Sequence, residues 1–246
     1  MPGPLLTFLG SGDAFSSGGR LQSGILIETV EGGLLLDCGV TVLAALQNCR
    51  LSSESIDAVV ISHLHGDHFG GLPFLLLEAL FVTKRTKPLH IIGPPGIEEG
   101  TVSLCRILYP GALDGPFQFR IDYSLLGQEP LDHDFFQVRG LRASHGQHAA
   151  AHSLRVAVGG REIAYTGDTE WTQDLIPLAK DADLLICECC NFDEPGPAHL
   201  DYRTLERERS KLETPRIILT HTGPAIHAHA DEIPLEIAHD GMQVQL

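Results

Sequence analysis

Three histidines and one aspartate lie within six consecutive residues of this chain, from His63 to His68. They follow the apolar run Ala58–Ile61, which is typical of a buried strand, and they precede Gly70 and Gly71. These glycines free the backbone, so that nearby side chains can turn toward a common point. Imidazole and carboxylate groups suit zinc, manganese or iron, whereas calcium and magnesium sites are rich in oxygen. The stretch therefore predicts a metal site at the end of a strand, in preference to a solvated polar loop.

The composition is consistent with one folded domain, residues 1–246, whose surface is unsuited to polyanions. Hydrophobic residues make up 43% of the chain, which is enough for a packed core. The formal net charge is −15, from 32 acidic and 17 basic side chains. Because nucleic-acid affinity depends largely on Lys/Arg–phosphate contacts, a long nucleic acid is not expected as a partner. A small anionic substrate steered by metal ions remains compatible with this charge.

Sequence features that would direct the chain to a membrane or to an oxidising compartment are missing. The best apolar segment, Leu72–Val82, is short for a bilayer and contains Glu78. The N-terminus lacks the basic region of a secretory signal, and six scattered cysteines do not form a disulfide framework. These features predict a cytoplasmic protein without membrane contact. We expect Cys187, Cys189 and Cys190 to be buried thiols, because their spacing is not that of a zinc site.

Short apolar runs alternate with helix-length amphipathic segments along the chain. Strands are predicted at Leu5–Gly10, Gly24–Thr29, Leu34–Asp37, Ala58–Ser62, Leu89–Gly93, Glu162–Thr166, Leu184–Glu188, Arg216–Thr220 and Met242–Leu246. Helices are predicted at Val40–Asn48, Leu72–Thr83, Ile97–Leu108, Asp174–Lys180 and Tyr202–Leu212. The region Phe117–Val158 has the denser strand pattern of an antiparallel sheet. This interleaving predicts one α/β domain in which helices cover layered sheets.

Three later polar residues follow predicted strands, where ligands can converge. They are His145, Asp168 and His221. In layered α/β folds, sites are assembled from loops at one end of the sheet. Taken singly, each residue is more typical of a turn cap or an ordinary hydrogen bond. Together with the first cluster they give five histidines and two aspartates, a set that suits two closely spaced metals with open positions for water and substrate.

The pattern His63-x-His65-x-Asp67-His68 resembles the HxHxDH motif of the metallo-β-lactamase superfamily. The resemblance extends over nearly the whole chain and implies an αββα sandwich, in which two mixed β-sheets are flanked by helices. It also implies two divalent metal ions, with zinc expected and manganese or iron as alternatives. The implied ligands are His63, His65 and His145 for one ion, Asp67, His68 and His221 for the other, and Asp168 as the bridge between them.

Within the superfamily, the chain is most similar to the ribonuclease Z branch. Phe8–Gly12 resembles its opening glycine loop, and Leu36–Gly39 resembles its Asp-Cys-Gly segment. Glu188 and His199 lie where the branch has a glutamate and a catalytic histidine, although its His-Glu-Ala-Thr motif reads Cys-Glu-Cys-Cys here. The chain also lacks the long insertion between His145 and Asp168 that grips tRNA in true ribonuclease Z enzymes. Armless relatives that hydrolyse small phosphodiesters, such as cyclic phosphates, are therefore the better comparison.

The resemblance implies a dinuclear phosphodiesterase in which a hydroxide that bridges the metals attacks phosphorus. Asp67 would orient the nucleophile or accept its proton, and His199, oriented by Glu188, would protonate the leaving oxygen. Asp37 is either a partner of a ligand histidine or an ordinary turn-capping residue. Dimers are common in the resembling branch, so a homodimer is one expectation. The alternatives are hydrolysis of a carboxyl ester, lactone or sulfate ester, tRNA 3′ processing, a redox di-iron enzyme, and a non-catalytic metal-binding interaction module.

Overall fold

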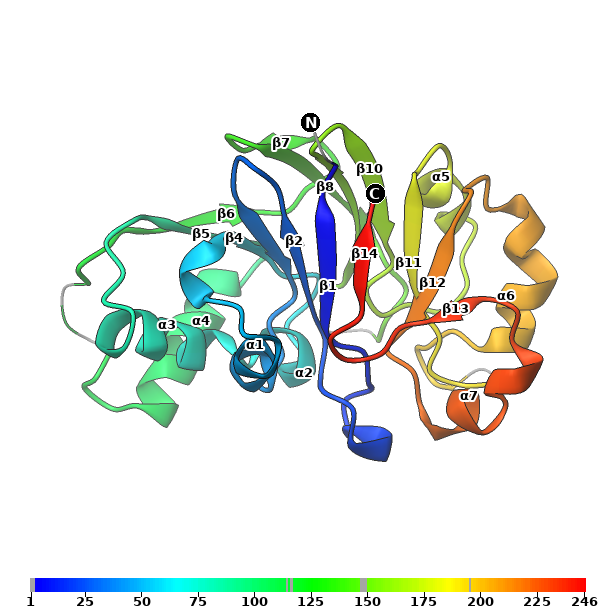
Figure 1. Cartoon of the computed structure of the whole chain (residues 1–246), viewed down its shortest axis with the longest axis horizontal. Helices are drawn as coiled ribbons and strands as arrows, with labels where there is room; N and C mark the ends of the chain where they lie inside the picture. The colour runs from blue at the N-terminus through cyan, green and yellow to red at the C-terminus, as the bar shows by residue number, and fades with distance from the viewer. Residues whose placement is uncertain (1–2, 114, 116, 147–149, 195) are drawn as a thin grey trace.

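A computed structural model describes the chain except for residues 1–2, 114, 116, 147–149 and 195. Two β-sheets pack face to face, and helices cover the outer face of each sheet (Figure 1). This arrangement confirms the αββα sandwich that the sequence predicts. No helix within the described residues is long and apolar enough to span a membrane.

The first sheet joins an antiparallel half to a parallel half. Its strands, in spatial order, are β14 (Gln243–Gln245), β1 (Leu5–Gly10), β2 (Gly24–Glu28), β3 (Gly33–Leu36), β4 (Ile56–Val60), β5 (Leu89–Gly93) and β6 (Ile121–Leu125). Pairing is antiparallel from β14 to β3 and parallel from β3 to β6. The helices against its outer face are α1 (Val42–Cys49), α2 (Gly66–Phe69), α3 (Leu72–Phe81) and α4 (Ile97–Leu108).

The second sheet is also mixed. Its strands, in spatial order, are β13 (Glu236–Ile237), β12 (Ile217–Thr220), β11 (Leu184–Glu188), β10 (Arg161–Tyr165), β9 (His152–Val158), β8 (Phe136–Arg142) and β7 (Leu131–Asp132). The helices of this half are α5 (Leu175–Ala179), α6 (Tyr202–Glu208) and α7 (Pro224–Ala228). Short 3₁₀ helices are η1 (Ser17–Gly19), η2 (Ser53–Ser55), η3 (Arg209–Lys211) and η4 (Ala230–Glu232).

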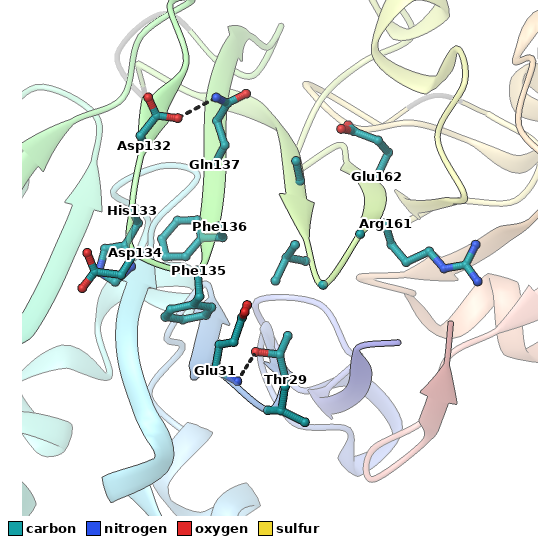
Figure 2. Close-up of a pocket in the computed structure, with 15 residues that line it drawn as sticks. Thr29, Glu31, Asp132, His133, Asp134, Phe135, Phe136, Gln137, Arg161 and Glu162 are labelled. Carbon is teal, nitrogen blue, oxygen red and sulfur yellow. Dashed lines mark hydrogen bonds between the residues drawn. The ribbon is translucent and has the colours of Figure 1, made fainter. Parts of the chain in front are cut away.

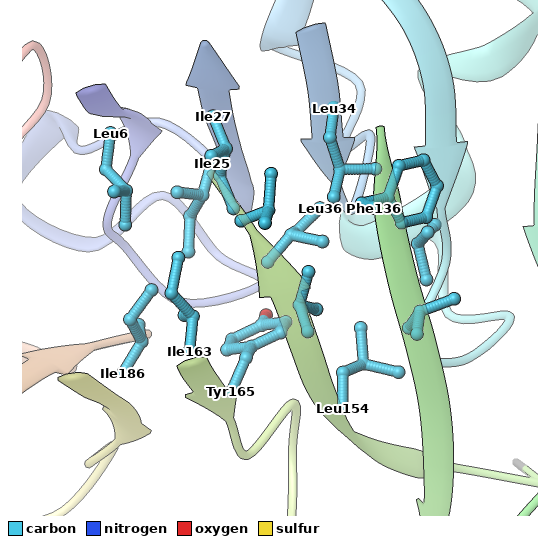
Figure 3. Close-up of a cluster of buried hydrophobic side chains, with 14 of the residues drawn as sticks. Leu6, Ile25, Ile27, Leu34, Leu36, Phe136, Leu154, Ile163, Tyr165 and Ile186 are labelled. Carbon is cyan, nitrogen blue, oxygen red and sulfur yellow. The ribbon is translucent and has the colours of Figure 1, made fainter. Parts of the chain in front are cut away.

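Alternating side chains build the separate apolar layers. Leu34 and Leu36 of β3 point between the sheets, whereas Leu35 points toward the helices. Ile25 of β2 and Ile163 of β10 lie in the layer between the sheets (Figure 3). Each fully buried aliphatic side chain of this kind contributes about 1.5–3 kcal/mol of transfer free energy, so the inter-sheet layer holds the two sheets together.

The prediction for the middle of the chain is wrong at its first strand. β6 belongs to the first sheet and pairs in parallel with β5, from Leu89↔Ile121 to Gly93↔Leu125. Only β7, β8 and β9 form the expected antiparallel meander with β10. The helix α4 and the chain that follows it return to the same edge of the sheet, as a parallel connection requires. Periodicity identifies a strand but carries no information about the direction of its partner.

The carboxyl ends of several parallel strands meet at one edge of the sandwich. β3, β4, β10, β11 and β12 all end there, at the lower edge of Figure 1 near α2 and α7. A backbone bridge from Gly12 to Thr222 connects the two sheets at this edge, and Thr222 N–H donates to Ser11 O at 3.1 Å. The loops after these strands are therefore held close together by the fold.

Candidate metal centre

The loop after β4 brings two histidines next to a third from the end of β8. His63, His65 and His145 have their candidate ligand atoms within 4.8 Å of one another. The Nε2 atom of His145 lies 3.0 Å from Nδ1 of His65. His63 is fully buried, and its Nε2 has no hydrogen-bond partner among the described residues. These three side chains form the first group of candidate ligands.

A second group lies beside the first and contains both carboxylates. Asp67 and His68 come from the single turn of α2, Asp168 follows β10, and His221 follows β12. Oδ2 of Asp67 is 3.3 Å from His68 Nε2 and 3.2 Å from His221 Nε2. Asp168 is 3.3 Å from His68 Nε2 and 3.4 Å from His221 Nε2. All four side chains are buried, so a cation here would be surrounded by protein ligands.

Asp168 faces both groups. Its Oδ2 atom lies 3.8 Å from Nε2 of His63 and 3.7 Å from Nε2 of His145, in addition to its contacts with the second group. Gly167, directly before it, has φ +55°, and a Cβ at that position would approach the carbonyl oxygen of His152 to 2.9 Å. A side chain at position 167 would therefore displace the loop that presents Asp168.

The electrostatics of the cluster are those of two anionic carboxylates among imidazoles. Burial, with a smaller contribution from His68, lowers the pKa of His63 to about 2. Burial opposes charge on His68 and His221, but Asp168 outweighs it and raises the pKa of both imidazoles well above the usual value. Burial also opposes ionisation of Asp67 and Asp168, yet the surrounding histidines hold the pKa of both carboxyls well below the usual range. In the absence of a metal, protons on the histidines offset the negative charge of the two carboxylates. A bound cation can replace those protons.

The donor atoms fit divalent metal ions. Buried polar atoms normally have a hydrogen-bond partner, but Nε2 of His63, Nε2 of His68 and Oδ1 of Asp168 have none within the described part of the chain. All three belong to the two groups of candidate ligands, so a bound cation would give each a partner. Five imidazoles and two carboxylates are the ligands that zinc, manganese and iron prefer.

Asp37 holds one of the candidate ligands in place. Its carboxylate accepts hydrogen bonds from His68 Nδ1 at 2.8 Å, Tyr165 Oη at 2.7 Å, Ser62 N at 2.7 Å and Ser62 Oγ at 2.9 Å. Asp37 also has φ +58°, in the left-handed region that aspartate tolerates better than most residues. Of the two roles that the sequence leaves open for Asp37, the structure shows a hydrogen bond to His68, a candidate ligand.

We expect Asp37→Asn to weaken cation binding by the second group of candidate ligands, which contains His68, about 10–100-fold. The amide would direct N–H bonds toward Ser62 or Tyr165, which already donate at this position. Titration of the metal-free protein with Zn²⁺ or Co²⁺ measures the effect. Tyr165→Phe is the matched control, because it removes one donor and leaves the carboxylate on His68. An Asp37→Asn protein that binds both ions as tightly as wild type would contradict this role.

His199 and Glu188 form a pair at the border of the cluster. His199 Nδ1 lies 3.1 and 3.2 Å from the two carboxylate oxygens of Glu188 and 4.0 Å from Asp168 Oδ2. Burial opposes charge on His199, but the hydrogen bond that its Nδ1–H donates to the Glu188 carboxylate raises its pKa above the usual value. Burial raises the pKa of Glu188, whose Oε1 also accepts the Thr169 N–H at 2.5 Å. About a quarter of the His199 side chain is exposed (24%), so part of the ring is open to solvent.

An open hollow of about 800 Å³ lies elsewhere on the molecule (Figure 2). It is lined by the β2–β3 turn with Glu31, by Asp132–Gln137 and by the β9–β10 turn with Arg161. Arg161 begins β10, whereas Asp168 follows the other end of that strand. The hollow is therefore at the edge opposite the candidate ligands.

Comparison with known proteins identifies the family. A family model described as Anti-Pycsar protein Apyc1 matches residues 5–234. The chain belongs to this family. The Bacillus subtilis (strain 168) protein named Probable metallo-hydrolase YhfI is 31% identical over 223 residues, which cover 88% of this chain and 86% of YhfI. A Halorubrum lacusprofundi protein named Ribonuclease Z is 27% identical over 291 residues, covering 96% of this chain and 92% of that protein.

Solved structures give the same fold for this Apyc1-family chain. The crystal structure of YhfI matches with a TM-score of 0.81 at 23% identity and covers 99% of this chain and 100% of that chain. The structure of a diphosphatase from the PhnP family matches with a TM-score of 0.79 at 16% identity, covering 99% and 98% of the two chains. With metallo-hydrolases and ribonuclease Z among its relatives, the protein is a metal-dependent hydrolase, as the sequence predicts.

Sequence reasoning missed several groups that position the candidate ligands in this Apyc1-family protein. Ser62 and Tyr165 anchor Asp37, and the Ala198 carbonyl accepts a hydrogen bond from His145 Nδ1 at 2.7 Å. Tyr165 gave one usable signal, because a tyrosine at an inward position of a core strand needs a partner for its hydroxyl. The Ala198 carbonyl gave no signal in the sequence, because every residue type has a backbone carbonyl.

Proposed function

We propose that this protein is a phosphodiesterase that uses two divalent metal ions, with zinc as the expected metal, and cleaves small or cyclic phosphodiesters. The observation that carries the proposal is the His199–Glu188 pair at 3.1 Å beside the two groups of candidate ligands. An alkoxide is a poor leaving group and needs a proton as its bond to phosphorus breaks. A histidine held beside the candidate metal ligands can supply that proton.

Each candidate residue has a definite task in this scheme. Two bound divalent ions would lower the pKa of a water molecule and neutralise charge on the phosphoryl oxygens. Asp67 orients the attacking water and can accept its proton. His199 Nε2 gives its proton to the leaving oxygen, while Glu188 holds the Nδ1–H side of the same ring. One P–O bond forms and another breaks, and the two proton transfers leave the net charge of the protein unchanged.

Two features support a small substrate over a long RNA, and a third favours phosphorus as the centre attacked. The formal net charge of −15 opposes binding of a polyanion. Most of the chain between His145 and Asp168 is occupied by β9 and β10, which leaves no room for an RNA-gripping arm. Relatives named ribonuclease Z and diphosphatase carry names that describe cleavage of phosphate bonds, which favours phosphorus over carbon or sulfur as the centre attacked.

A substrate panel tests the proposal. Protein loaded with Zn²⁺ or Mn²⁺ is expected to hydrolyse bis(p-nitrophenyl) phosphate and a cyclic phosphodiester. It should hydrolyse a carboxyl ester, a lactone and a sulfate ester much more slowly. Chelated protein provides the background rate. Turnover of an ester without turnover of either diester would reject the phosphodiesterase and leave a metal-dependent hydrolase of another class. Preferential cleavage of precursor tRNA would instead support the tRNA-processing alternative.

A further inference from the structure

The buried candidate histidines differ in what their second ring nitrogen contacts. A metal-ligating histidine normally donates its other N–H to an oxygen, which fixes the ring. Nδ1 of His63 lies 3.1 Å from Ser62 Oγ, Nδ1 of His68 lies 2.8 Å from Asp37, and Nδ1 of His145 lies 2.7 Å from the Ala198 carbonyl. His221 is the exception.

Nδ1 of His221 is buried and has no hydrogen-bond partner in the described portion of the structure. The side chain is only 2% exposed, so bulk water does not reach it freely. Its other nitrogen, Nε2, faces Asp67 and Asp168 at 3.2 and 3.4 Å. The backbone of His221 has φ +51°, a conformation that costs about 1–3 kcal/mol in a residue other than glycine. The surrounding structure therefore holds the backbone of His221 in place, and the unpartnered Nδ1 leaves open what orients the ring.

The Cys190 thiol is next to this ring. Its Sγ lies within 4.8 Å of a ring nitrogen of His221 and of a ring nitrogen of His199. The Cys190 backbone is fixed on both sides: its N–H donates to Leu200 O at 3.1 Å, and its carbonyl accepts from Gly223 N–H at 3.2 Å. The sequence prediction of three buried thiols is wrong here, because Cys190 is half-buried while Cys187 and Cys189 are buried.

We propose that Cys190 is a positioning residue whose sulfur accepts the Nδ1–H of His221, so that Nε2 is directed at the metal centre. Sulfur is a weaker acceptor than oxygen, so this contact is weaker than the oxygen contacts of the other three histidines. In the resembling ribonuclease Z motif, threonine stands at this position, and its hydroxyl offers an acceptor at the same place in the chain. The inference rests on the proposed metal centre and is independent of the substrate.

The same contact makes the metal centre a target for thiol modification. Alkylation by iodoacetamide forms an S–C bond, expels iodide and releases the thiol proton to solvent. The added group is larger than the thiol and would lie between the His221 ring and Gly223, where a Cβ would already be in van der Waals contact with Cys190 Sγ at 3.6 Å. We therefore expect the alkylated side chain to displace the His221 ring. The other half-buried thiol is Cys49, the last residue of α1, whose sulfur lies beside Gly241, and it supplies a matched control.

Cobalt binding tests the proposal without any substrate. Metal-free protein is titrated with Co²⁺, and the visible absorption and the heat of binding give the affinity and geometry of each ion. We expect Cys190→Ala to weaken the second ion about 10–100-fold and to change its spectrum. Cys190→Thr should restore both. Equal binding by wild type and Cys190→Ala, or equal weakening in the alanine and threonine variants, would overturn the proposal.

Alkylation provides a second test, in which the wild-type protein is modified after it has folded. Iodoacetamide should release the second ion from wild type and from Cys49→Ser, while the same treatment should leave Cys190→Thr with both ions. Release of the ion from alkylated Cys190→Thr would overturn the proposal. Because the readout is metal affinity, failure of this inference remains distinguishable from failure of the phosphodiesterase proposal, which depends on the substrate panel alone.

Discussion

Asp168→Ala is expected to reduce hydrolysis to the level of chelated protein. The carboxylate faces imidazoles of both groups of candidate ligands, at distances of 3.3 to 3.8 Å, so its loss would take a candidate ligand from both proposed cation sites. The loss of affinity should therefore exceed the roughly 10–100-fold that the loss of an outer partner costs. Metal content per chain and turnover of bis(p-nitrophenyl) phosphate measure the two effects.

Thermal unfolding separates metal loss from misfolding in the Asp168→Ala protein. A cation that binds only the folded state stabilises wild type by about 2.7 kcal/mol at a hundredfold excess over its Kd, so added Zn²⁺ should raise the Tm of wild type. The variant should unfold cooperatively but show little response to Zn²⁺. Asp174→Ala, at an exposed aspartate before α5, is the control and should respond like wild type. Two ions per chain in Asp168→Ala would contradict the bridging role.

The arrangement of the sheets was predictable because two of its causes are local. Leu34–Leu36 alternates between two apolar layers, and such a buried strand reads as an unbroken hydrophobic run in the sequence. Polar residues directly after such runs, such as Asp168 after β10, lie at the carboxyl edge of a parallel sheet. The partner of β6 was not predictable, since pairing direction depends on the path of the chain through α4.

The short helices escaped prediction for a different reason. α2 is a single turn of four residues, too short to show a helical period, and its side chains are those of the HxHxDH motif. α7 begins with Pro224 at its first position, which is a helix-start signal that the hydrophobic pattern alone does not use. Both helices lie at the candidate metal centre, so the missed elements are those that carry or follow ligands.

The candidate ligands could be identified from the sequence, but the groups that orient them could not. His63 to His68 form a local motif whose residue types indicate metal chemistry. The hydrogen bond from Tyr165 to Asp37 joins residues 128 positions apart, and tyrosine in a strand is usually read as core. Cys190 illustrates the same limit, because its contact with His221 arises only when β11 and β12 pair in parallel.

His199→Ala is expected to lower turnover of an alkyl phosphodiester by about 10²–10⁴-fold while both ions stay bound. The imidazole touches Glu188 at 3.1 Å and is 4.0 Å from Asp168, so its removal takes away a proton donor and leaves the ligand set complete. Steady-state kinetics on a substrate with an alkoxide leaving group measure the loss, and metal analysis confirms the ion content. His229→Ala, at a histidine that pairs with Glu232, is the matched control.

The leaving group distinguishes a proton donor from a residue that only shapes the site. p-Nitrophenolate departs without a proton, so His199→Ala should impair bis(p-nitrophenyl) phosphate much less than an alkyl diester. Glu188→Gln should follow the same ranking with a smaller loss, because the amide can still accept from Nδ1 but no longer stabilises a charged ring. Equal losses on both substrates, or loss of metal from His199→Ala, would show that the ring supports the cation site and does not protonate the leaving oxygen.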